Sequence, residues 1–98
     1  MIVRVWKGRG TSEGIERYCR EHFEPVVLPE LRTVDGFVDA EVLVRDGELL
    51  VATRWESLDA VRGFAGDELE RAVVEPVVAG LLDSYDDIVT HYTVAVRS

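Results

Sequence analysis

The stretch WESLDAVRGFAGD, residues 55–67, decides the fold, because it joins the end of one strand to the start of a helix. Trp55 closes an apolar run, and the Ser57 hydroxyl can cap a helix by accepting a hydrogen bond from an amide of the first turn. Gly66 supplies the flexible residue that helix C-termini favour. The stretch therefore predicts a strand followed directly by a short capped helix.

The strand that ends at Trp55 is predicted to pair with the strand before it across Asp46-Gly47. This dipeptide favours a two-residue type I′ turn, in which both central residues have positive φ. The register places opposite charges or apolar residues against each other in the pairs Arg45–Glu48, Val44–Leu49, Val42–Val51 and Asp39–Arg54. One face then carries Val38, Ala40, Val42, Val44, Leu49, Val51, Thr53 and Trp55. The other face mixes charged residues with the apolar residues Phe37, Leu43, Leu50 and Ala52.

The N-terminal part predicts a strand and then a helix. Residues 2–7 alternate, and the helix begins near Thr11. Its apolar stripe consists of Ile15, Tyr18, Cys19, His22 and Phe23. Pro25 lacks an amide donor and therefore predicts a kink before residues 26–31.

The C-terminal part predicts another helix and a last strand. Pro76 suits a first helical turn, followed by an aligned set made of Val78, Leu81, Leu82 and Tyr85. Alternation predicts a strand over residues 88–96. The order βαββαβ is the ferredoxin-like α+β arrangement, an antiparallel sheet with helices on one face, in a single domain over residues 1–98. The apolar residues of the other face predict a homodimer that packs sheet against sheet.

Composition limits the partners. The 98 residues carry a net charge of −8, which disfavours nucleic acid and anionic membrane surfaces. No apolar run reaches the length of a bilayer span. The single cysteine, Cys19, excludes an internal disulfide and suits a reducing compartment, so we expect a cytoplasmic protein.

The run WESLDAVRGFAGDELERAVVEP, residues 55–76, together with Val34–Phe37 and His91-Tyr92, resembles the antibiotic biosynthesis monooxygenase family. The resemblance spans nearly the whole chain and implies a dimeric α+β barrel. It also implies a cofactor-independent oxygenase of the kind that converts polycyclic phenols to quinones. Trp55 matches the family pattern, whereas Val51 and Val61 occupy the positions of its strand Asn and helix Tyr.

A related branch of that superfamily cleaves haem with an Asn of the N-terminal strand and a His of the broken second helix. The chain contains no Asn, and residues 72–74 contain no His. These differences argue against haem degradation and for a site without a cofactor. Two histidines with no carboxylate beside them on one face also make a weak metal signal, so we expect no metal.

His22 and His91 are the candidate catalytic residues, since an imidazole exchanges protons near neutral pH. His22 lies on the apolar stripe and is predicted to face the sheet, either as a base or as a core histidine satisfied by a hydroxyl or a carbonyl. His91 either shares the cavity of His22 or lies at the dimer interface. The candidate substrate-binding residues, each of which could also be ordinary packing, are Trp55, Tyr18, Tyr85 and Phe64.

Two functions follow. The first is a small cofactor-free monooxygenase that deprotonates a flat aromatic or polyketide-like substrate, whose anion then reacts with oxygen. The second is a non-catalytic dimer of the same fold that binds a small apolar ligand or serves as a structural module. The missing Asn and Tyr favour the second function, and the two histidines favour the first.

Overall fold

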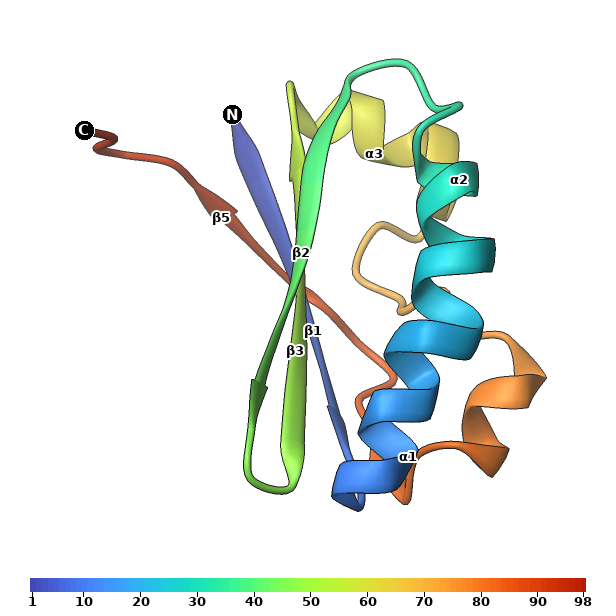
Figure 1. Ribbon diagram of the computed structural model, residues 1–98. Helices are drawn as coiled ribbons and strands as arrows, with labels where there is room; N and C mark the ends of the chain where they lie inside the picture. Colours follow the sequence, from blue (N-terminus) through green and yellow to red (C-terminus); the bar gives the residue numbers. More distant parts are fainter.

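A five-stranded antiparallel sheet with helices on one face makes up the computed structural model, which describes residues 1–98 (Figure 1). The strands are β1 (Ile2–Arg9), β2 (Phe37–Arg45), β3 (Glu48–Trp55), β4 (Ser84–Tyr85) and β5 (Thr90–Thr93). Their order is β2-β3-β1-β4, and β5 also pairs with β1. The predicted α+β, ferredoxin-like class is confirmed.

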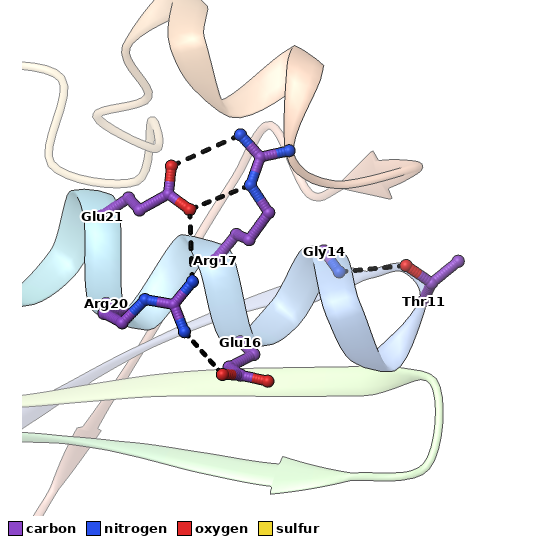
Figure 2. A network of polar contacts seen from close by, with 6 residues as sticks. All are labelled: Thr11, Gly14, Glu16, Arg17, Arg20 and Glu21. Carbon is purple, nitrogen blue, oxygen red and sulfur yellow. Dashed lines mark hydrogen bonds and ion pairs between the residues drawn. The ribbon is translucent and has the colours of Figure 1, made fainter.

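The first helical region runs through α1 (Ser12–Arg17), η1 (Tyr18–Val27) and α2 (Leu28–Leu31). It begins where the Thr11 hydroxyl accepts a hydrogen bond of 3.0 Å from the Gly14 amide. Exposed ion pairs then follow the helical spacing of four residues, Arg17 with Glu21 and Arg20 with Glu16 (Figure 2). Such pairs add a few tenths of a kcal/mol each, about 0.2–0.5.

Pro25 lies where the sequence predicted a kink between two α-helical pieces. Residues 18–27 instead form a π-helix, in which the Leu28 amide donates to the Phe23 carbonyl five residues back. Proline has no amide hydrogen and crowds the carbonyl one turn before it, and the wider π-helical turn accommodates both effects. The π-helix includes Tyr18 and His22, two of the candidate site residues.

The predicted register of β2 and β3 is confirmed in all four pairs. The predicted type I′ turn is wrong, because Gly47 has φ of 77° while no residue other than glycine has positive φ. Asp46 therefore stays outside the left-handed region, which costs an L-residue roughly 1–2 kcal/mol. A positive φ at only the second central residue is the pattern of a type II turn.

Phe37 lies on the opposite side of the sheet from the one predicted. The register shifts between Phe37 and Asp39, so Val38 is an extra residue in β2. Such a bulge reverses the direction of the side chains before it. The Phe37 ring consequently packs against Trp55, with centroids 5.3 Å apart and an edge-on angle of 71°.

The C-terminal region also differs from its prediction. Tyr85 belongs to β4 rather than to a helix, and only a short 3₁₀ helix, η2 (Pro76–Gly80), follows Pro76. Of the expected strand over 88–96 only β5 (Thr90–Thr93) forms along β1, and β4 (Ser84–Tyr85) pairs with β1 before that range. Residues 87–89 pair instead with the connecting loop (residues 66–75), through bonds of 2.8 Å between Ala72 and Asp87 and between Val89 and Glu70.

The core lies between the sheet and the helices that cover one of its faces. The helix α3 (Leu58–Ala65) also packs on this face. Ser57 caps α3 through a bond of 3.1 Å from the Ala60 amide, and Gly66 ends it with φ of 76°, as predicted. The largest fully buried side chains are those of Trp55, Leu31, Leu49, Val61 and Val78. No helix is both long and apolar enough to span a bilayer.

Candidate functional site

A cavity of about 60 Å³ lies between the sheet and η1. Its polar and charged lining residues are Arg4, His22, Glu30, Thr53 and Glu75, and its aromatic walls are Trp6, Tyr18, Phe23 and Phe64. The connecting loop supplies another wall through Val73 and Val74. A cavity that holds benzene measures about 150 Å³, so a ring-sized ligand requires part of this wall to move.

His22 opens into this cavity. The π-helix directs it toward the sheet, and the residue is 4% exposed. The imidazole has no hydrogen-bond partner in the protein, and neither ring nitrogen is sealed from the cavity. The alternative of a core histidine satisfied by a hydroxyl or a carbonyl is therefore not what the structure shows. A free imidazole nitrogen facing a cavity can take up a proton from a bound molecule.

Tyr18 lies next to His22, with ring centroids 5.6 Å apart. Its side chain is buried, and its hydroxyl has no protein partner. Burial raises the pKa of the Tyr18 phenol far above its ordinary value. The hydroxyl therefore stays protonated and can donate a hydrogen bond to a ligand in the cavity.

Arg4 is a site residue that the sequence analysis did not select. It is 4% exposed, and it donates to the carbonyls of Leu69 and Arg71 at 2.6 and 2.9 Å. Burial lowers the pKa of its guanidinium to about 10, with no opposing contribution from a carboxylate. The side chain is thus a buried cation without a counter-ion. Its place on the apolar face of β1, between Ile2 and Trp6, was the available signal, since arginine is rarely buried unpaired.

His91 faces the helical side of the sheet but does not line the cavity. It is the register partner of Arg4 across β1 and β5, and its Nε2 lies 3.0 Å from Arg4 Nη1. Because the guanidinium can only donate, Nε2 accepts and the ring proton is on Nδ1. Burial first, and then the charge of Arg4, lower the pKa of His91, while Glu70 opposes them. His91 therefore neither shares the cavity of His22 nor lies on the open face of the sheet, the two positions that were expected for it.

The four predicted aromatic residues divide into two pairs. Tyr18 and Phe64 line the cavity. Trp55 has no exposed surface and lies behind Phe64, with ring centroids 6.0 Å apart, while its indole donates to the Thr53 hydroxyl at 2.9 Å. Tyr85 does not line the cavity and packs against Trp6, with ring centroids 6.0 Å apart. Trp55 and Tyr85 therefore support the lining residues instead of belonging to them.

Side chains that bind metals do not gather in this structure, since no group of three His, Cys, Asp or Glu residues is close enough to hold an ion. Cys19 is partly buried, outside the cavity, and burial raises the pKa of its thiol. A thiol with a raised pKa is a poor nucleophile. The buried side chains of His22, Tyr18 and Arg4 line the cavity and can donate or accept hydrogen bonds there.

No model of a protein family matches the chain, and no curated protein matches it. Solved structures do match over the full length. One is a protein from Bacillus cereus provisionally named an antibiotic biosynthesis monooxygenase, with a TM-score of 0.68, 19% identity, and coverage of 99% of this chain and 95% of that one. Another, from Deinococcus radiodurans and provisionally given the same name, has a TM-score of 0.61 and 17% identity, and covers 100% and 95%.

A further match is a monooxygenase from the gene ActVA-Orf6 of Streptomyces coelicolor, solved in complex with nanaomycin D. Its TM-score is 0.68 at 20% identity, with coverage of 99% of this chain and 88% of that one. At these identities the likeness establishes a shared fold. The fold is therefore the α+β, ferredoxin-like one of these named monooxygenases.

Proposed function

We propose that the protein belongs to the antibiotic biosynthesis monooxygenase family and is a cofactor-free oxygenase of a flat aromatic or polyketide-like substrate. One observation carries the proposal: a buried imidazole, His22, opens without a protein partner into a cavity with aromatic walls. Its nearest ring, Tyr18, carries a donor hydroxyl. The shared fold supports the family, and the sequence resemblance supports the reaction class.

The reaction uses dioxygen as its only co-reactant. His22 accepts a proton from the activated C–H or O–H of a hydroxylated ring system, which leaves an electron-rich anion. A carbon of this anion forms a C–O bond to dioxygen, and the proton from His22 completes a hydroperoxide. Loss of the second hydrogen from that carbon breaks the O–O bond and releases water. The methylene group has then become a ketone, and the second oxygen atom has become water.

Tyr18, Phe64 and Trp6 hold the ring in this scheme, because their faces line the cavity. His91 is not the base, since its Nε2 is occupied by Arg4 and its pKa is lowered. Val73 and Val74 of the connecting loop form the wall that moves to admit a molecule larger than the present 60 Å³. Trp55 and Tyr85 act only through the residues that they support.

The proposal includes a homodimer formed through the open face of the sheet. Helices cover only one face (Figure 1). On the other face Leu43 is 50% exposed beside its register partner Leu50, and Tyr92 is 57% exposed. An apolar face of this kind is covered most simply by its own copy. We also keep a cytoplasmic location in the proposal, on the basis of the single unpaired Cys19.

The test is oxygen consumption with dithranol, a tricyclic hydroxyanthrone, and with related phenols. We expect one dioxygen consumed per ketone formed, and a loss of about 100-fold or more in rate for His22→Gln. The control is Arg20→Gln, which changes an exposed side chain on the same helix and should retain the rate. An equal rate for His22→Gln and the wild type would refute the role of His22.

A non-catalytic ligand-binding module is the second candidate. The observation that favours it is Val51, which lines the cavity at the position where the resemblance would place an Asn. A valine cannot hydrogen-bond a phenolate at that wall. Ligand binding with no oxygen consumption across a broad set of phenols would favour this candidate over the oxygenase.

A further inference from the structure

Arg4 is the one cationic residue among those that line the cavity, and no carboxylate neutralises its charge. The two carboxylates of the lining, Glu30 and Glu75, form no ion pair with Arg4 and are exposed to solvent. A buried cation whose only partners are neutral keeps most of its desolvation cost, which an anion placed beside it would reduce. The interior of the cavity is therefore electrostatically suited to a negative group.

We infer that Arg4 is the oxyanion-binding residue of this cavity and that flat phenols bind there in their ionised form. The inference rests on the proposed function for the choice of cavity, but it does not depend on any reaction with oxygen. It assigns the substrate class as phenols or enols that are acidic enough to ionise in the site. It also gives the anion formed by proton transfer to His22 a partner in the protein.

The guanidinium has donors left for a ligand. Of its five N–H groups, two on Nη1 are directed to Leu69 O and His91 Nε2, and one on Nη2 is directed to Arg71 O. The second Nη2 hydrogen and the Nε hydrogen have no protein acceptor. The Arg4 Cζ lies 6.0 Å from the centre of the Phe64 ring, which is a wall of the cavity. A ring that packs on Phe64 thus lies within reach of these donors.

The partners of Arg4 link its position to the wall that must move. Leu69 and Arg71 belong to the connecting loop, whose later residues Val73 and Val74 line the cavity. His91 is a positioning residue, because it holds Nη1 from the opposite side. A displacement of the loop would free further N–H groups of Arg4 while His91 still oriented the guanidinium.

The experiment uses para-nitrophenol, whose phenol and phenolate forms absorb at different wavelengths, and nitrobenzene as its neutral counterpart. Binding of each to the full chain is measured by absorbance and tryptophan quenching, and the bound phenol is titrated with pH. For the wild type we expect the pKa of bound para-nitrophenol to fall by about one unit or more, which is a tenfold preference for the anion. Arg4→Lys should retain part of this shift.

For Arg4→Met we expect the shift to vanish while nitrobenzene still binds, which shows that the cavity is intact. An unshifted pKa in the wild type would overturn the inference, and so would failure of both ligands to bind. A shifted pKa together with no oxygen consumption on any phenol would support Arg4 and refute the oxygenase. Oxygen consumption at a rate that Arg4→Met does not change, together with an unshifted pKa, would support the oxygenase and refute the role of Arg4.

Discussion

Arg4 Nη1 lies 3.0 Å from Nε2 of His91, across the register pair that joins β1 to β5. The contact requires a neutral His91 with its proton on Nδ1. It also holds the guanidinium at the edge of the cavity into which His22 opens. The two histidines therefore have different roles, one as a free imidazole in the cavity and the other as a support for a buried cation.

Stability should depend on pH through His91. Its pKa is lowered in the folded protein, so the unfolded chain binds a proton at higher pH than the folded one does. The free energy of unfolding should therefore fall as the pH drops below about 6.5 and continue to fall toward the folded pKa. The charged groups that face His91 are Arg4, which adds to this effect, and Glu70, which opposes it.

The measurement is urea unfolding of the wild type and His91→Gln at about pH 7 and about pH 5.5, above the range in which most carboxylates titrate. Glutamine keeps an acceptor for Arg4 but does not titrate. We expect a smaller loss of stability for the variant over this interval. Equal losses in the two proteins would show that His91 is not the group responsible.

Trp55 should matter for stability, since it has no exposed surface and contacts both Phe37 and Phe64. We expect Trp55→Ala to lower the free energy of unfolding by about 3–5 kcal/mol, the usual cost of removing a large buried aromatic side chain. Chemical denaturation measures this directly. A loss below about 1 kcal/mol would contradict a core position and indicate that Trp55 lines the cavity.

Gly36 and Gly47 form a matched pair of glycines with positive φ, 87° and 77°. A Cβ at Gly36 would lie 2.5 Å from the Ala60 Cβ, whereas one at Gly47 would meet nothing within 4 Å. Gly47→Ala should therefore lower the free energy of unfolding only by the cost of placing an L-residue in the left-handed region, roughly 1–2 kcal/mol. Gly36→Ala should lose clearly more, because α3 must also shift. Equal thermal shifts for the two variants would contradict this close approach of the helix.

The dimer proposal can be tested at two exposed aliphatic residues on opposite sides of the sheet. Leu43 on the open face and Val77 on η2 are 50% and 52% exposed, so each tolerates a charge equally well in a monomer. We expect light scattering to find a dimer for the wild type and Val77→Asp, and a monomer for Leu43→Asp. A dimer that survives Leu43→Asp would place the interface elsewhere.

Local signals in the sequence predicted most of the fold. Ser57 and Gly66 predicted both ends of α3, and charge pairing such as Asp39 with Arg54 predicted the hairpin register. The failures arose where tertiary contacts outweigh local preference. Phe37 changed face at a bulge, and residues 87–89 pair with the connecting loop and not with β1. Neither event has a periodic signature, because each depends on residues distant in the chain.

The site was harder to predict than the fold. His22, Tyr18 and Phe64 were predicted from residue type and helical spacing, and all three line the cavity. Arg4 was missed because its role depends on carbonyls about 65 residues away, those of Leu69 and Arg71. A charged residue on the inward face of a central strand was nevertheless visible in the alternation of residues 2–7.

The most direct test of the central claim is a crystal structure of the protein with a bound hydroxyanthrone or para-nitrophenolate. The account predicts a ring between Tyr18 and Phe64, with an oxygen within hydrogen-bond distance of Arg4 and an acidic hydrogen near His22. It also predicts that Val73 and Val74 have moved outward. A ligand bound on the open face of the sheet, with the cavity unchanged, would contradict the account.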